Sequence, residues 1–214
     1  MNSTYFFTDF ATQPDEYKQL QFLKSKGLLR TCGFIGLYGN ASILAAADLD
    51  AQSASIWETL AQCREIYVCP SAAARRGIDT TQASAPRPGL RWLSLAAMLE
   101  HIAPNDGEPR EISVSLNSDS YLARIEALEL CLAAIALDFS VQLNLRGPGI
   151  LGLQQSLGNA GAKGYASLAM FGIPHAFIAP ADIALLAPFR LLEDALTLPW
   201  QLGEALQMPL MLEF

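Results

Sequence analysis

Cys69 has the clearest potential for chemistry in this sequence, because it closes the apolar segment IYVC and enters the loop PSAAARRGID. In open α/β sheets, functional groups gather at the carboxyl ends of strands, which is where this thiol is expected. Arg75 and Arg76 follow it closely, and guanidinium groups stabilise a thiolate. No His or Asp stands beside Cys69 as a dedicated base. The pattern points away from protease-like catalysis and toward a thiol that works alone, in persulfide or disulfide exchange.

The surroundings expected for Cys69 are positively charged. The segment SAAARR can open as a helical turn, and a helix N-terminus favours a thiolate. Three further basic residues are close in sequence, namely Arg64, Arg87 and Arg91. We therefore expect arginines gathered around the thiol.

The alternative for Cys69 is a buried residue at a strand end, because free cysteine is among the most buried residue types. Cys32 lies in an apolar strand and Cys131 in an apolar helix, so both are expected in the core. Cys63 ends a helix on the same segment as Cys69. It is interpreted as a helix-end residue, with a second thiol as the other possibility.

Other candidate groups have simpler interpretations. His101 and His175 are expected on the surface or in a loop rather than as catalytic bases. The run Gly147-Pro148-Gly149 has neither the Lys-Ser/Thr of a phosphate loop nor the spacing of a dinucleotide fingerprint, so it predicts a tight turn. Two histidines and no CxxC give no metal motif, and no cofactor or metal is expected.

Composition narrows the class of protein. The chain has 214 residues, 51% of them hydrophobic and 16% charged, which excludes intrinsic disorder. Its net charge of −7 disfavours direct binding to nucleic acid. Most of this net negative charge lies in the second half of the chain. No signal peptide or membrane span is evident, and four cysteines are too few for a disulfide scaffold. We expect a cytoplasmic protein with free thiols and no membrane partner.

The chain repeats itself at about half its length. Gly39 in FIGLYGNASIL matches Gly147 in VQLNLRGPGIL at an offset of 108, and Trp92 matches Trp200 at the same offset. Cys69-Pro70 finds its partner in Ala179-Pro180 at an offset of 110. These matches predict two homologous domains, residues 1–105 and 110–214, joined by the turn-rich linker 104–109.

Each half alternates strands with helices, which predicts an α/β fold with parallel sheets. We expect two flavodoxin-like three-layer halves that form a pseudo-dimer. Strands are expected at 5–8, 31–37, 66–69, 112–116, 140–145, 177–179 and 209–214. Helices are expected at 15–29 with an early end near Gly27, and at 53–62, 92–102, 121–137, from 150 onward and at 200–206. The first half shows no strand equivalent to the closing LMLEF.

The segment IYVCPSAAARRGID resembles the reactive-cysteine loop of the DsrE-like sulfur-relay family, in particular its TusD-type subunit. The second half resembles the TusC-type subunit in its apolar helix ARIEALELCLAAIAL, its LRGPGILGL run and its final strand ending in Phe. The resemblance implies a natural fusion of two subunits.

That resemblance also implies a function. Cys69 would accept sulfur as a persulfide and donate it, in tRNA 2-thiouridine synthesis or in sulfur oxidation. Arg75 and Arg76 would steady the thiolate or dock an acidic sulfur-carrier protein. Related subunits in an oligomer or hetero-complex are the other implied partners. Ala179 cannot hold sulfur, so the second half is expected to be a structural partner. The alternative is a non-catalytic module that keeps the family fold within a sulfur-transfer complex.

Overall fold

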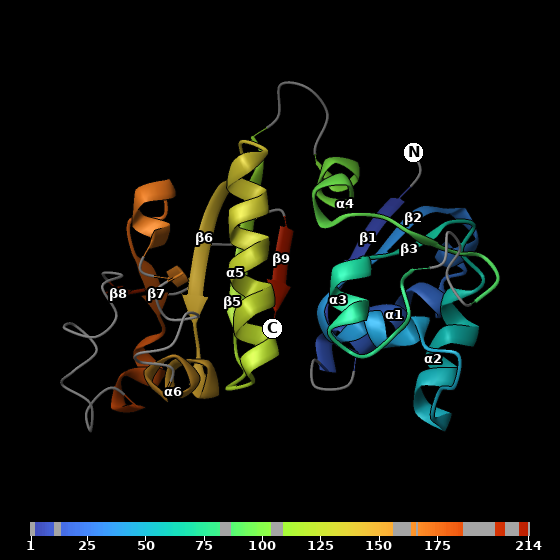
Figure 1. The fold of residues 1–214 in the computed structure, drawn as a ribbon, viewed down its shortest axis with the longest axis horizontal. Coiled ribbons are helices and arrows are strands. Elements are labelled where there is room, and N and C mark those ends of the chain that lie inside the picture. The colour runs from blue at the N-terminus through green and yellow to red at the C-terminus, as the bar shows by residue number, and fades with distance from the viewer. Residues whose placement is uncertain are drawn as a thin grey trace. The chain divides into compact units, whose positions relative to one another are not determined.

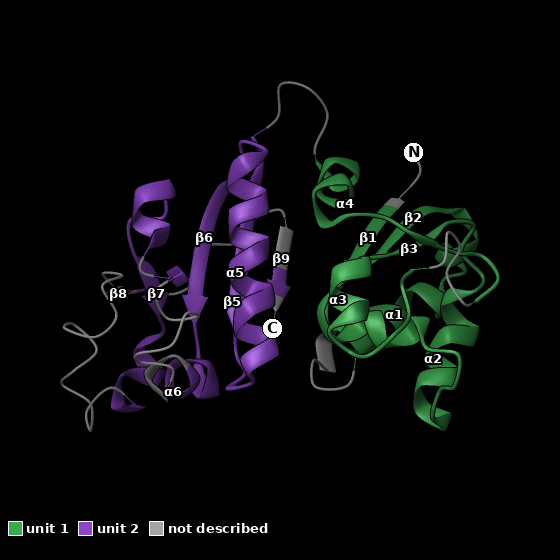
Figure 2. Cartoon of the chain, viewed as in Figure 1, with its two compact units in different colours: residues 1–103 green, residues 104–214 purple. Residues whose placement is uncertain are grey.

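The chain folds as two compact units, residues 1–103 and 104–214 (Figure 2). The computed structural model describes residues 3–10, 14–81, 87–103, 109–155, 164–165, 167–185, 200–203 and 210–213. Most of the expected linker, residues 104–108, lies outside this described part. Among the described residues, no helix is both long and apolar enough to cross a membrane.

Unit 1 contains a four-stranded parallel sheet with its strands in sequence order (Figure 1). The strands are β1 (Ser3–Phe7), β2 (Cys32–Leu37), β3 (Ile66–Val68) and β4 (Leu90–Trp92). The helices are α1 (Pro14–Ser25), α2 (Ala51–Leu60), α3 (Pro70–Ala74) and α4 (Leu95–Ile102), with short 3-10 helices η1 (Leu28–Thr31) and η2 (Gly39–Ala45).

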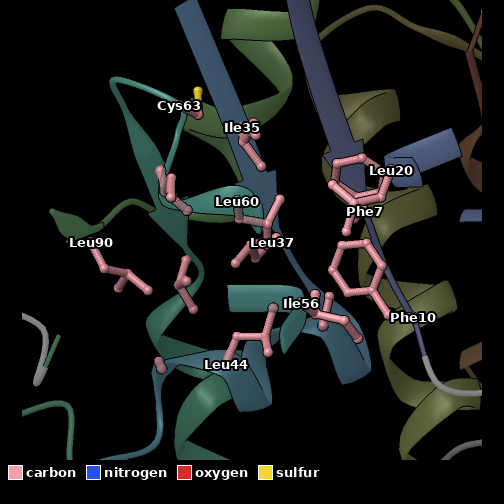
Figure 3. Close-up of a cluster of buried hydrophobic side chains, with 14 of the residues drawn as sticks. Phe7, Phe10, Leu20, Ile35, Leu37, Leu44, Ile56, Leu60, Cys63 and Leu90 are labelled. Atoms are coloured by element: carbon pink, nitrogen blue, oxygen red, sulfur yellow. The ribbon is translucent and has the colours of Figure 1, made fainter. Parts of the chain in front are cut away.

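Helices cover both faces of this sheet. Successive strand residues point to opposite faces, so neighbouring residues of one strand pack against different helices. Ile35 belongs to a core that includes Leu20 of α1 and Leu60 of α2 (Figure 3). Its neighbour Phe34 points the other way and stacks on His101 of α4, with ring centroids 4.7 Å apart. Full burial of such an apolar side chain contributes about 1.5–3 kcal/mol. Unit 1 is therefore a three-layer α/β unit whose core fixes the carboxyl ends of the strands.

Unit 2 contains a five-stranded parallel sheet in the order β8-β7-β6-β5-β9. Its strands are β5 (Glu111–Leu116), β6 (Ser140–Leu145), β7 (Ala176–Ile178), β8 (Trp200–Leu202) and β9 (Leu210–Glu213). The α-helices are α5 (Tyr121–Ala136), which packs on β5 and β6, and α6 (Gly147–Gln155). Two 3-10 helices are also described, η3 (Leu168–Phe171) and η4 (Pro180–Leu185).

The two sheets share the order of their first four strands. Unit 2 adds β9 beside β5, and the described part of unit 1 has no strand at the equivalent outer edge of β1. The expected α/β class with parallel sheets is thus confirmed. In the described part, the first sheet has four strands and the second has five.

Two of the expected helix starts are wrong. Trp92 ends strand β4, and α4 begins only at Leu95, after its N-cap residue Ser94. Trp200 begins strand β8, and residues 204–206 of the expected last helix lie outside the described part. Apolar residues at helical spacing suggested helices in both places, but pairing with β3 and β7 makes these short segments strands.

The strand registers also revise one match of the repeat. Ile66 pairs with Leu90, and Ala176 pairs with Trp200. Trp200 is therefore the structural equivalent of Leu90, at the offset of 110 that also relates Cys69 to Ala179. Trp92 and Trp200 are not equivalent positions.

Two glycine segments differ in how well they were predicted. Gly27 has a φ of 68° and follows the end of α1 at Ser25, so the early helix end is confirmed. The run Gly147-Pro148-Gly149 is not an isolated turn, because α6 begins at Gly147. Proline favours the first turn of a helix, which accounts for this earlier start.

Candidate functional site

The candidate site lies at the carboxyl edge of the first sheet, where β1, β2 and β3 end side by side. Backbone hydrogen bonds carry the pairing just beyond the strands, from the N–H of Tyr38 to the Phe7 oxygen at 3.0 Å and from the N–H of Cys69 to the Leu37 oxygen at 3.1 Å. Cys69 directly follows β3, whereas the predicted strand 66–69 included it as the last residue. The segments after β1, β2 and β3 are therefore neighbours in space.

Cys69 is the N-cap residue of α3, and Pro70 occupies the first turn of that helix. The Cys69 carbonyl accepts a hydrogen bond from the N–H of Ala73 at 3.1 Å. Its Sγ lies 3.3 Å from the Oγ of Ser71, within hydrogen-bond distance. The expected helical turn after the cysteine is therefore present.

Burial is the feature of Cys69 that bears most on its chemistry. Only 1% of the residue is exposed, whereas its hydrogen-bond partner Ser71 is exposed. The sulfur is therefore almost closed to reagents in this conformation, with the exposed Ser71 in contact with it. This burial also fits the alternative of an inert strand-end cysteine.

The two arginines of the predicted site lie at the end of α3. Arg75 is the C-cap residue of this helix and is half-buried. Arg76 donates one hydrogen bond to the Ala72 carbonyl at 3.0 Å and another from Nε to the Oδ1 of Asn40 at 3.4 Å. Arg76 therefore ties α3 to the segment after β2, besides adding positive charge to this loop.

Asn40 extends this connection to the end of β1. Its Nδ2 donates a hydrogen bond to the Oδ1 of Asp9 at 3.1 Å. Asp9, Asn40 and Arg76 thus form a polar chain across the segments that follow β1, β2 and β3. Sequence reasoning missed Asp9 and Asn40, although both come just after apolar strand segments, which is the signal that could have identified them.

Glu16 of α1 occupies the backbone donors just after β1, another feature that sequence reasoning missed. Its carboxylate accepts hydrogen bonds from the Thr8 N–H at 2.8 Å, the Thr8 hydroxyl at 2.6 Å and the Asp9 N–H at 2.9 Å. Burial nevertheless raises the pKa of Glu16 to about 7, outweighing these hydrogen bonds. The donors that an external anion would need at this strand end are therefore used internally.

A small cavity of about 70 Å³ lies beside the polar chain. Its lining includes Asp9, Asn40 and Asp50, together with apolar residues of η2 and α2, and Cys69 lies outside that lining. Two carboxylates make the cavity unsuited to a phosphate or another anion.

Arg87, one of the further arginines expected near the thiol, makes its contacts elsewhere. Arg87 donates to the carbonyls of Ala46 and Ala47, both at 2.8 Å, and its guanidinium lies over the ring of Trp57. Arg64 precedes β3 and so lies at the opposite edge of the sheet from Cys69. Arg91 is exposed on β4. Arg64 and Cys69 are close in sequence, but they lie at opposite ends of strand β3.

The remaining candidates take the positions predicted for them, with one addition. Cys32 and Cys131 are buried, and His101 is exposed on α4. Cys63 follows α2 and is buried, and its thiol lies 3.4 Å from the backbone oxygen of Cys32. This pairing was not foreseen, because the two residues lie 31 positions apart in sequence.

The second half repeats the backbone plan without the thiol. Ala179 follows β7, and η4 begins at Pro180, as α3 begins at Pro70 after Cys69. The N–H of Asp182 donates to the Ala179 carbonyl at 2.9 Å. A methyl side chain at this position cannot carry sulfur.

Comparison of the chain with protein-family models, curated proteins and solved structures finds no match.

Proposed function

We propose that this protein is an intracellular sulfur-relay protein that accepts and donates persulfide sulfur at Cys69. The observation that carries the proposal is the placement of this thiol at the carboxyl end of β3, capping α3 and hydrogen-bonded to Ser71. Carboxyl ends of parallel strands are where α/β sheets hold their functional groups. The resemblance of this loop to the DsrE-like family supports the same assignment.

The reaction needs only the thiol of this chain. The Cys69 thiolate attacks the outer sulfur of a donor persulfide, the donor's S–S bond breaks, and the donor leaves as a thiolate. Cys69 now carries the persulfide. An acceptor thiolate then attacks that outer sulfur and releases the Cys69 thiolate. No net oxidation or reduction occurs, so no further reactant is required.

Arg76 and Asn40 are positioning residues in this proposal. Their hydrogen bond at 3.4 Å and the bond from Arg76 to Ala72 hold α3, whose first turn packs beside the thiol. Arg75 and Arg76 also give this loop positive charge, which suits an acidic sulfur-carrier protein as the partner. The identity of that carrier protein decides whether the sulfur goes to tRNA thiolation or to sulfur oxidation.

The second candidate is a non-catalytic binding or assembly module of a sulfur-transfer complex. The observation that favours it is the 1% exposure of Cys69. In this alternative the second half, with Ala179 in place of the cysteine, has already lost the thiol that a relay needs.

Persulfide loading distinguishes the two candidates. The full-length protein is incubated with a small persulfide donor, alkylated and digested with trypsin. Trypsin places Cys69 on peptide 65–75, Cys32 and Cys63 on peptide 31–64, and Cys131 on peptide 125–146. The relay predicts one additional sulfur on peptide 65–75. Loading should be lost in Cys69→Ser and kept in the matched control Cys131→Ser.

Peptide 65–75 without additional sulfur, in a protein that remains folded by circular dichroism, would favour the module over the relay. Sulfur that appears on peptide 125–146 to the same extent would show unselective labelling and would also count against Cys69.

A further inference from the structure

Cys32 and Cys63 form a second thiol site at the opposite edge of the first sheet from Cys69. Cys32 is the first residue of β2, and Cys63 lies in the turn between α2 and β3. Both residues therefore lie near the amino ends of these strands, whereas Cys69 follows the carboxyl end of β3. Figure 3 shows Cys63 at the margin of the apolar core.

The strand register brings these two residues together. Ile35 of β2 pairs with Ile66 of β3, and the Ile35 N–H donates to the Glu65 carbonyl at 3.0 Å. Three residues further back along both segments are Cys32 and Cys63. Neighbouring strands lie about 4.8 Å apart, which falls within the Cα separation that a disulfide spans.

Hydrogen bonds confirm the proximity of the two thiols. The Cys63 thiol lies 3.4 Å from the backbone oxygen of Cys32, within hydrogen-bond distance. The Cys32 thiol in turn lies 3.2 Å from the Phe34 carbonyl. Neither cysteine is part of a disulfide in this structure. The Cys63 sulfur is therefore already in contact with Cys32 in the reduced protein.

The two thiols differ in accessibility and acidity. Cys63 is 7% exposed and Cys32 is 2% exposed, and the exposed residues Gln62 and Arg64 flank Cys63. The hydrogen bond from Cys32 lowers the pKa of Cys63 to about 7, against burial and the nearby Glu65 carboxylate. The same interaction raises the pKa of Cys32. Cys63 is thus the attacking thiol and Cys32 the resolving thiol.

We propose that Cys32 and Cys63 form a redox-active dithiol that undergoes exchange with small organic disulfides. The Cys63 thiolate attacks one sulfur of the disulfide, the S–S bond of the reagent breaks, and one thiolate leaves. Cys32 loses its proton to solvent and attacks Cys63, so a Cys32–Cys63 disulfide forms and the second thiolate leaves. The protein loses two electrons and two protons, and one disulfide is reduced to two thiols.

Glutathione disulfide is the probe that tests this proposal. The full-length protein is incubated with it, the remaining thiols are alkylated, and trypsin is added without reductant. Cys32 and Cys63 share peptide 31–64, so their disulfide appears as that peptide lighter by two hydrogen atoms and without alkylation. The same result is expected in Cys69→Ser, because the two sites are independent.

Single variants identify the role of each thiol. In Cys32→Ser the resolving thiol is absent, so a glutathione adduct should remain on Cys63. In Cys63→Ser the attacking thiol is absent, so peptide 31–64 should remain without an adduct. Circular dichroism checks that both variants are folded, and the wild-type measurement does not depend on them.

A wild-type peptide 31–64 that stays fully alkylated, or that carries two glutathione adducts, would overturn the proposal. The relay is assessed on a different peptide, 65–75, so failure of one proposal can be told apart from failure of the other.

Discussion

Arg76 donates a hydrogen bond to Asn40 at 3.4 Å, which joins the end of α3 to the segment after β2. Asn40 donates in turn to Asp9 after β1. The helix that Cys69 caps is therefore held by side chains from two other strand ends. In the proposed relay, this connection controls how readily the first turn of α3 uncovers the thiol.

Replacing Arg76 should loosen the cover of Cys69. Arg76→Ala removes the hydrogen bonds to Asn40 and Ala72, which should lower the free energy of unfolding of unit 1 by about 1–3 kcal/mol. Alkylation of peptide 65–75 in the native protein should become faster. Denaturant unfolding and timed labelling measure the two effects.

Arg91→Ala is the matched control, because Arg91 is exposed on β4. It should leave both measurements close to wild type. Equal labelling rates in wild type and Arg76→Ala would show that this polar chain does not hold the cover of the thiol.

Glu16 should make the stability of unit 1 depend on pH. Its pKa is about 7 in the folded protein and 4.5 as its ordinary value, so both states are protonated below pH 4.5. Between these values the folded state retains a proton that the unfolded state has lost. The free energy of unfolding should therefore fall as pH rises, by up to about 3 kcal/mol in total.

Glu16→Gln keeps the size of the side chain and removes its titration. Chemical unfolding at pH 5 and pH 8 should show a smaller difference in this variant than in wild type. If the two proteins show the same pH dependence, another group is responsible.

The thiol pair should give Cys63 a characteristic reactivity. Alkylation of peptide 31–64 at Cys63 should rise with pH around a midpoint of about 7. Cys32→Ala removes the hydrogen bond that contributes most to this shift, so the midpoint should move toward the ordinary value of 9.0. Labelling at pH 7 should then slow by up to about 50-fold. An unchanged midpoint would contradict the pairing of the two thiols.

Gly149 marks a close approach in unit 2. A Cβ at this position would collide with the backbone oxygen of Leu116 at the end of β5, and backbone cannot move aside cheaply. Gly149→Ala should therefore lower the unfolding free energy by about 2 kcal/mol or more. Gly147→Ala is the control, with a positive φ but open space, and should cost only about 1 kcal/mol. The reverse order in thermal unfolding would contradict this packing.

Long apolar strands and the main helices were predictable from the sequence. Cys32–Leu37 form β2 within the predicted bounds 31–37, because a continuous apolar run suits a strand buried on both faces. Short strands were not predictable in the same way. Trp92 and Trp200 lie in three-residue strands whose identity depends on pairing with β3 and β7 rather than on local pattern.

The candidate site was predictable only where its residues are adjacent in the sequence. The position of Cys69 after a strand and before a helical turn follows from adjacent residues. The Asp9–Asn40–Arg76 chain and the pairing of Cys32 with Cys63 depend on strand register, which brings distant residues together. Arg87 shows the converse, because it is close to Cys69 in sequence but bonds to Ala46 and Ala47.

Transfer of sulfur out of the protein tests the central claim most directly. Protein loaded from a persulfide donor containing radioactive sulfur is separated from the donor and mixed with an excess of a small acceptor thiol. The account predicts that the label leaves peptide 65–75 and appears on the acceptor, and that Cys69→Ser never acquires it. Label that is absent from peptide 65–75, or that stays there when the acceptor is added, would contradict the assignment of Cys69 as a sulfur relay.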